Sequence, residues 1–112
     1  MLGGDAMAEN KSSVLSIDRK KYAKAMAENL PVLRAKLNLS QGELADMIGI
    51  TRQTLSAAEC GSRELAWNNF ISLLYIFTQN EMTLPLLTAL GIYTIELDSL
   101  FRRTDLKRLK DI

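Results

Sequence analysis

The chain has 112 residues, 47% of them apolar, which allows one domain with a small hydrophobic core and a short extension. Lys and Arg number 14 against 13 Asp and Glu, so the formal net charge is only +1, and any nucleic-acid-binding surface has to be local. Histidine is absent and Cys60 is the one cysteine. These counts exclude a Ser-His-Asp or Cys-His site within one chain, a His-rich metal site and an intrachain disulfide.

The sequence also argues against an enzyme and against a membrane protein. We find no phosphate-binding loop, metal motif or paired carboxylates, so we expect no catalytic residue, no metal and no cofactor. No apolar run approaches the length that crosses a bilayer, and a lone cysteine suits a reducing compartment, so we expect a cytoplasmic protein. Residues 1–17 include a small, polar stretch and are expected to be a flexible tail.

The first predicted helix follows Asp18, which can cap it, and extends to about residue 38. Pro31 falls inside this helix and lacks the amide hydrogen that the helix needs. It therefore either kinks the helix or starts a new one near Asn29, and we favour a kink or a short break. Apolar residues recur at steps of three and four and predict one buried stripe, made of Tyr22, Met26, Leu30, Leu33 and Leu37.

A second helix is predicted over residues 41–48, because Ser40 and Glu43 have the S-x-x-E spacing of a capping box. In that motif the serine oxygen accepts the amide hydrogen of the glutamate, and the glutamate side chain accepts that of the serine. The expected inward face of this helix consists of Leu44, Met47 and Ile48.

The third helix is expected to follow almost at once. Gly49 can take the left-handed conformation that ends a helix, and Thr51 can cap a new helix over residues 52–59, which Gly61 then ends. Small side chains at Ala45 and Ala58 would let the two helices approach closely. Four larger residues would join them to each other and to the first helix: Leu44, Ile48, Ile50 and Leu55.

The next segment, residues 67–77, is apolar almost all round. Leu73 and Ile76 are left over from its predicted core face and need another cover. The residues expected to face the core are Trp67, Phe70, Ile71, Leu74 and Phe77.

Two further helices are predicted near the C-terminus. Thr83 and Pro85 mark the start of one and Gly91 its end, and Thr94 opens the other. The alternation over residues 92–97 leaves a strand as the weaker alternative. Charges suit the dipole of the last helix, with Glu96 and Asp98 in its first turn and Arg102 and Arg103 in its last.

Two short helices joined by a turn with glycine constitute a helix-turn-helix. The unpaired backbone amides at the start of the second helix favour the binding of a polyanion. Arg52 can bind guanine through two hydrogen bonds and Gln53 can bind adenine in the same way, while Ala57 can touch a thymine methyl. Ser56 lies one turn further along the same face. Gln41, at the start of the preceding helix, can bind a phosphate.

The stretch from residue 30 to residue 77 resembles the phage repressor and Cro type of helix-turn-helix domain, the XRE family. The resemblance is carried by LSQGELA at residues 39–45, by Gly49, and by the E-x-G sequence at residues 59–61. In this family a long polar side chain that contacts a base often occupies the position of Ala57. Because alanine cannot make such a hydrogen bond, we expect fewer direct base contacts. Asn38 replaces a frequent glycine, but asparagine tolerates the left-handed conformation.

The resemblance implies a role for each matching position. Arg34 and Glu59 would form a structural ion pair. The base-reading residues would be Arg52, Gln53, Ser56 and Ala57, and the contacts to the DNA backbone would come from Gln41, Thr51, Ser62 and Arg63.

We therefore expect an all-α protein, a compact five-helix repressor-like domain with one or two extra C-terminal helices. The predicted segments are the tail, the helix-turn-helix domain over residues 18–80 and a C-terminal extension over residues 81–112. Residues 67–101 could fold back to complete the core or form a two-fold homodimer interface, and we expect them to do both. The expected function is sequence-specific binding of double-stranded DNA by a bacterial or phage transcriptional regulator. The alternative is an antitoxin-like or regulatory module on the same scaffold, with a protein partner.

Overall fold

The computed structural model describes residues 17–102, and in this range the chain is helical without strands. Arg19–Tyr93 form one compact unit that holds α2 to α6, and α7 belongs to a second unit. In chain order the helices are α2 (Arg19–Leu37), α3 (Gln41–Ile48), α4 (Arg52–Glu59), α5 (Trp67–Thr78), α6 (Leu84–Ala89) and α7 (Ile95–Arg102). The tail predicted for residues 1–17 lies outside the described residues except for Ile17, and Arg103 lies outside them altogether.

Helix α2 begins at Arg19, directly after Asp18, and continues through Pro31 without a break. A helix starting near Asn29, or a short break there, is therefore wrong. Proline is tolerated because its ring is exposed and only one backbone hydrogen bond is lost. Leu37 is only half-buried. The other predicted stripe residues are buried, together with two alanines: Tyr22, Ala23, Met26, Ala27, Leu30 and Leu33.

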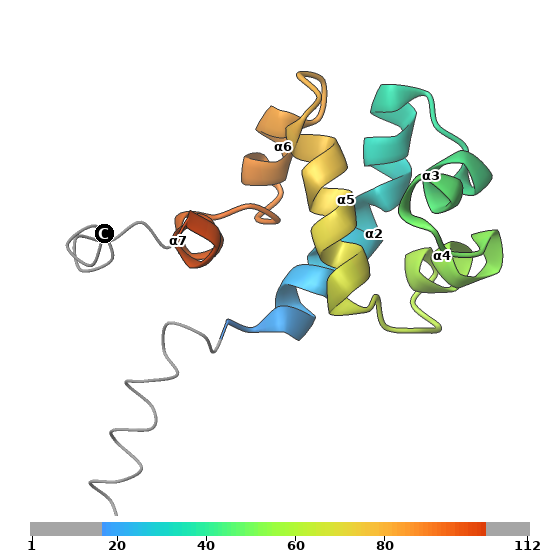
Figure 1. The fold of residues 1–112 in the computed structure, drawn as a ribbon, viewed down its shortest axis with the longest axis horizontal. Coiled ribbons are helices and arrows are strands. Elements are labelled where there is room, and N and C mark those ends of the chain that lie inside the picture. The colour runs from blue at the N-terminus through green and yellow to red at the C-terminus, as the bar shows by residue number, and fades with distance from the viewer. Residues whose placement is uncertain (1–16, 103–112) are drawn as a thin grey trace, which may run out of the picture. The chain divides into compact units, whose positions relative to one another are not determined.

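Helix α5 lies at the centre of the compact unit. It contacts α2, α3 and α6, and Figure 1 shows it between α6 and the α3–α4 pair. This explains why a helix apolar almost all round is stable in water. Leu73, expected to lack cover, is fully buried, and the expected core residue Ile71 is only half-buried. Trp67 is half-buried too, and its ring stacks on Phe70 with the ring centroids 4.6 Å apart.

Helix α6 begins where it was predicted, but Thr83 works differently. Its side chain is buried and donates to the carbonyl of Phe77 at 2.7 Å instead of capping α6. Gly91 ends the segment with a φ of +72°. The hydroxyl thus ties the loop back to α5, which contacts α6.

Helix α7 confirms the prediction from Thr94 and makes the strand alternative wrong. The Thr94 hydroxyl accepts the amide hydrogen of Leu97 at 3.2 Å. Asp98 and Arg102 form an ion pair of 2.8 Å one turn apart. The acidic first turn and the basic last turn therefore agree with the helix dipole.

Candidate nucleic-acid interface

The turn between α3 and α4 depends on glycine for its backbone angles. Gly49 has a φ of +79°, and its amide donates to the carbonyls of Ala45 and Asp46. A β-carbon at this position would meet no atom within 4 Å. The left-handed conformation, rather than crowding, is thus the reason for glycine here. The chain reverses at this point and leaves Ile50 and Thr51 to lead into α4.

The capping box predicted at the start of α3 is present. The Ser40 Oγ accepts the amide hydrogen of Glu43 at 3.0 Å, and the Glu43 carboxylate accepts that of Ser40 at 2.8 Å. Hydrogen bonds to the Glu43 carboxylate, chiefly from the Ser40 backbone amide and secondly from the Ser40 side chain, hold the pKa of Glu43 below its ordinary value. Met47, expected to face inward, is 55% exposed, because the buried face of α3 is made by Leu44 and Ala45.

Helix α4 is anchored by its apolar face. Leu55 and Ala58 are buried, and the helix packs against α2 and α3. The Thr51 Oγ1 caps it by accepting the amide hydrogen of Thr54 at 3.1 Å. The opposite face is open to solvent: Arg52 and Gln53 are exposed, and Ser56 and Ala57 are half-buried. The four predicted base-reading residues therefore lie on one accessible side of a short, anchored helix.

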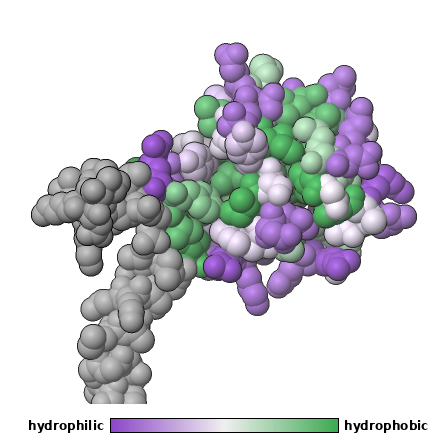
Figure 2. Space-filling model, in the orientation of Figure 1, coloured by the Kyte–Doolittle hydropathy of each residue, from purple (hydrophilic) through white to green (hydrophobic). Residues whose placement is uncertain are grey.

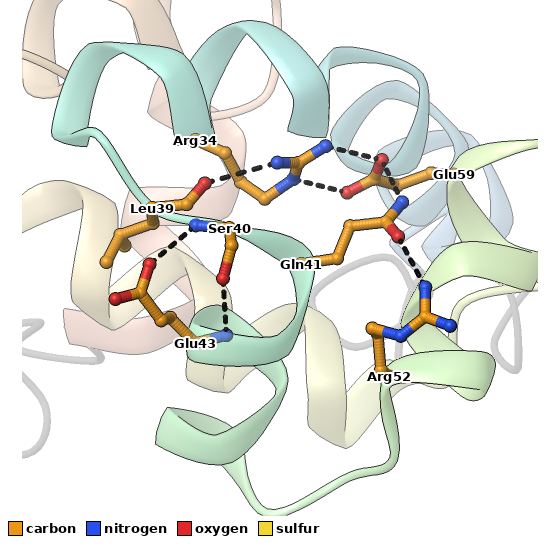
Figure 3. A network of polar contacts seen from close by, with 7 residues as sticks. All are labelled: Arg34, Leu39, Ser40, Gln41, Glu43, Arg52 and Glu59. Carbon is orange, nitrogen blue, oxygen red and sulfur yellow. Dashed lines mark hydrogen bonds and ion pairs between the residues drawn. The ribbon is translucent and has the colours of Figure 1, made fainter.

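Arg34 in α2 and Glu59 at the end of α4 meet in a two-pronged ion pair (Figure 3). The Arg34 Nε donates to Glu59 Oε2 at 2.7 Å and its Nη2 donates to Oε1 at 3.0 Å. The third nitrogen, Nη1, donates to the carbonyl of Leu39 at 3.1 Å. The side chains are 18% and 7% exposed. The pair thus joins α2 to α4, and one arginine also holds the chain that leads into α3.

Gln41 extends this network toward the tip of α4. Its Nε2 donates to Glu59 Oε1 at 2.9 Å, and its Oε1 faces Arg52 Nη1 at 3.5 Å, a long contact (Figure 3). The Glu59 carboxylate can only accept hydrogen bonds, so the side-chain nitrogen of Gln41 must point to Glu59 and its oxygen to Arg52. The side chain expected to bind a phosphate therefore lies between the ion pair and Arg52.

The loop after α4 carries the other two predicted backbone contacts. Ser62 and Arg63 are both exposed, and the chain reverses at Gly61 with a φ of +82°. The Ser62 hydroxyl donates to the carbonyl of Ala57 at 3.3 Å. Hydrogen bonds from Ser62 also lower the pKa of the exposed Cys60 thiol. The loop thus folds back on the end of α4.

The carbonyl of Leu39 is a member of this network that the sequence did not reveal. Its position follows from Asn38, which has a φ of +55° and directs the chain back over α2. The tolerance of asparagine for the left-handed region was the available signal. Which side chain then reaches the carbonyl depends on tertiary structure.

In the range 17–102 no group of three or more Cys, Asp or Glu side chains could hold a metal ion. None of the helices in this range is both long enough and apolar enough to cross a bilayer.

Comparison with known proteins gives one match. A family model described as helix-turn-helix matches residues 33–66, which include α3, α4 and both members of the ion pair. No curated protein and no solved structure matches the chain. The exposed face of α4, the glycine turn and the family match all indicate a helix-turn-helix. The chain thus contains, over residues 33–66, a helix-turn-helix domain of the phage repressor and Cro type.

Proposed function

We propose that the protein is a transcriptional regulator that binds double-stranded DNA in a sequence-specific manner, with the N-terminal end of α4 in the major groove. The observation that carries this proposal is the exposure of Thr51, Arg52 and Gln53 at the start of a helix that is anchored behind them. A short helix of this kind fits the width of the major groove. Such a regulator would act in the cytoplasm.

Each exposed residue of α4 suits one kind of contact. Arg52 can donate two hydrogen bonds to O6 and N7 of guanine, and Gln53 can bind N6 and N7 of adenine. Ser56 can bind either edge, and the methyl group of Ala57 can contact that of thymine. Thr51, together with Ser62 and Arg63 of the loop, would hold phosphates and fix the register.

Gln41 would act mainly by positioning Arg52. Its amide is held by Glu59, and its oxygen is the atom that faces the guanidinium. Ordering Arg52 before DNA arrives lowers the entropy cost of binding. The Gln41 Nε2 carries two hydrogens and donates one of them to Glu59, so a phosphate contact by the other is compatible with this network.

A homodimer would place two α4 helices on two half-sites, about 34–36 Å apart along B-form DNA. Apolar side chains that the unit leaves exposed support this arrangement: Tyr75 is 67%, Met82 60% and Leu84 42% exposed. Figure 2 shows apolar surface interspersed among polar residues on the face in view. Sedimentation of the full chain at the concentrations that bind DNA should give a dimer mass, and a monomer mass there would remove this part of the proposal.

The same exposed side chains favour a second candidate function, a protein-interaction module with weak or secondary DNA binding. The exposed side chains of Met47 and Tyr75 both line a shallow recess, together with Ile71 and Ile76. Purification of the native protein from its source cells separates the two functions. A stoichiometric partner protein, together with loss of DNA binding, would favour the interaction module.

The direct test is selection from a random duplex library with the full chain. The recovered sequences should share a motif, and fluorescence anisotropy should show that the chain prefers the selected duplex to random DNA by at least about 10³-fold. Recovery of unrelated sequences that bind no better than random DNA would reject sequence-specific binding.

A further inference from the structure

A cavity of about 610 Å³ opens between the first half of α2 and the segment that joins α4 to α5. This volume is in the range of cavities that bind small molecules. Its apolar lining is formed by residues that the fold buries and that are mostly small, namely Ala23, Ala27, Ala58 and Leu65. Trp67 forms another part of the lining. An apolar body of moderate size could therefore lie against methyl groups and the Trp67 indole.

Charged side chains also line the cavity. Lys20 and Glu64 form an exposed ion pair of 4.0 Å. Lys24 and Glu28 form a second pair at the same distance, and the carboxylate of Glu59 is held by α2. Each lining carboxylate thus has a cationic group within 4.0 Å.

Two guanidinium groups remain at the cavity. Arg19 lies 5.5 Å from the centroid of the Trp67 ring, and Arg63 is exposed on the loop. Among residues 17–102, neither arginine has a carboxylate within ion-pair distance. An arginine binds a carboxylate through two parallel hydrogen bonds. The cavity therefore offers anion-binding groups beside an apolar surface.

We propose that this cavity binds a small carboxylate with an apolar body, with the carboxylate at Arg19 or Arg63 and the body against the alanines. The wall also includes Glu59, Cys60 and Gly61 at the end of α4. Glu59 is the residue that holds Arg34 and Gln41. A ligand that shifts this end of α4 changes the affinity for DNA, and DNA changes the affinity for the ligand by the same factor. This coupling rests on the proposed function, whereas binding itself does not.

The test is an NMR titration of the full chain with 4-phenylbutyrate, and with its uncharged amide as the matched control. Trp67 is the one tryptophan in the chain, so its indole N–H gives a single signal in the cavity. We expect saturable shifts of this signal and of the amides of Cys60 and Gly61. The amide probe should bind at least about tenfold more weakly, because it lacks the charge. Absence of shifts at millimolar probe, or equal binding of both probes, would overturn the proposal.

Two leucine substitutions locate the site without disturbing the core. Ala66 is exposed and lines the cavity, so Ala66→Leu should weaken binding of 4-phenylbutyrate at least about fivefold by occupying its space. Ala89 is exposed in α6 and is not part of the lining, so Ala89→Leu should leave binding unchanged. Thermal unfolding checks that both variants fold. Unchanged binding by Ala66→Leu would show that the probe binds elsewhere.

The coupling is measured separately, as the affinity for the selected duplex with and without saturating 4-phenylbutyrate. We expect a change of at least about fivefold in either direction. No change would reject the coupling and leave the cavity as a ligand site. Binding of the probe by a chain that selects no DNA would reject the proposed function and leave the cavity site intact.

Discussion

The α3–α4 pair and the α5–α6 region are held by different physical means. The first adds directional polar contacts to its buried leucines and alanines: a capping box, a threonine cap and the ion pair between Arg34 and Glu59, with a left-handed glycine in the turn. The second is held by apolar burial around α5, with the Thr83 hydroxyl bond to the Phe77 carbonyl added. Directional contacts fix where α4 points, whereas burial leaves an apolar surplus at residues such as Tyr75.

The largest effect should come from breaking the ion pair. Arg34→Ala leaves Glu59 buried without its main partner, so we expect a loss of about 3–5 kcal/mol in the free energy of unfolding, measured with urea. Lys24→Ala, which removes a member of an exposed pair, is the matched control and should change it by about 0.5 kcal/mol or less. Similar losses for the two variants would show that the buried pair does not anchor α4.

Base reading should be the next largest effect. Arg52→Ala and Gln53→Ala should each weaken binding to the selected duplex by about 1–3 kcal/mol and affect random DNA much less, because they remove contacts to base edges. Anisotropy titrations on both duplexes measure this difference. Equal losses on both duplexes for Gln53→Ala would contradict its assignment as a base reader.

Arg63→Ala is the counterpart on the DNA backbone. It should weaken binding to selected and random DNA alike, and lower the slope of log K against log salt by about 1, since one phosphate contact is lost. A salt titration of each duplex tests this. A loss confined to the selected duplex would move Arg63 from the backbone to the bases.

The Thr51 cap should contribute less to stability. Thr51→Ala removes the acceptor for the Thr54 amide, which should lower the free energy of unfolding by about 1 kcal/mol. Thr51→Ser keeps the oxygen and should lose much less. Urea unfolding of the two variants compares them, and equal losses would attribute the effect to the methyl group and not to the cap.

The smallest effect should come from acid. The pKa of Glu43 is lowered in the folded chain, so its contribution to stability is present above the ordinary value of about 4.5 and is lost as the pH falls through the lower folded value. Glu43→Gln does not titrate there. Below that pH the native chain should therefore lose free energy of unfolding relative to the variant. Urea unfolding of both chains at several pH values will measure this loss. A stability difference that does not change with pH would show that the charge of the Glu43 carboxylate does not stabilise the fold.

Local signals explain why so much of the α3–α4 pair could be predicted. Ser40, Gly49 and Thr51 act on their own neighbours in the chain, so their spacing is enough to place the helices. The burial of Leu73 and the exposure of Met47 could not be predicted, because each depends on which helices pack against α5 and α3. The orientation of Gln41 likewise depends on Glu59, which lies 18 residues away in the chain.

The central claim is that the exposed start of α4 reads bases in the major groove. It is tested most directly by replacing purines of the selected duplex, one at a time, with 7-deaza analogues that lack the N7 acceptor of the major groove. At one guanine the native chain should lose about 1–3 kcal/mol of binding free energy, and Arg52→Ala should be insensitive to the same replacement. The claim would be contradicted if every sensitive purine remained equally sensitive in both Arg52→Ala and Gln53→Ala.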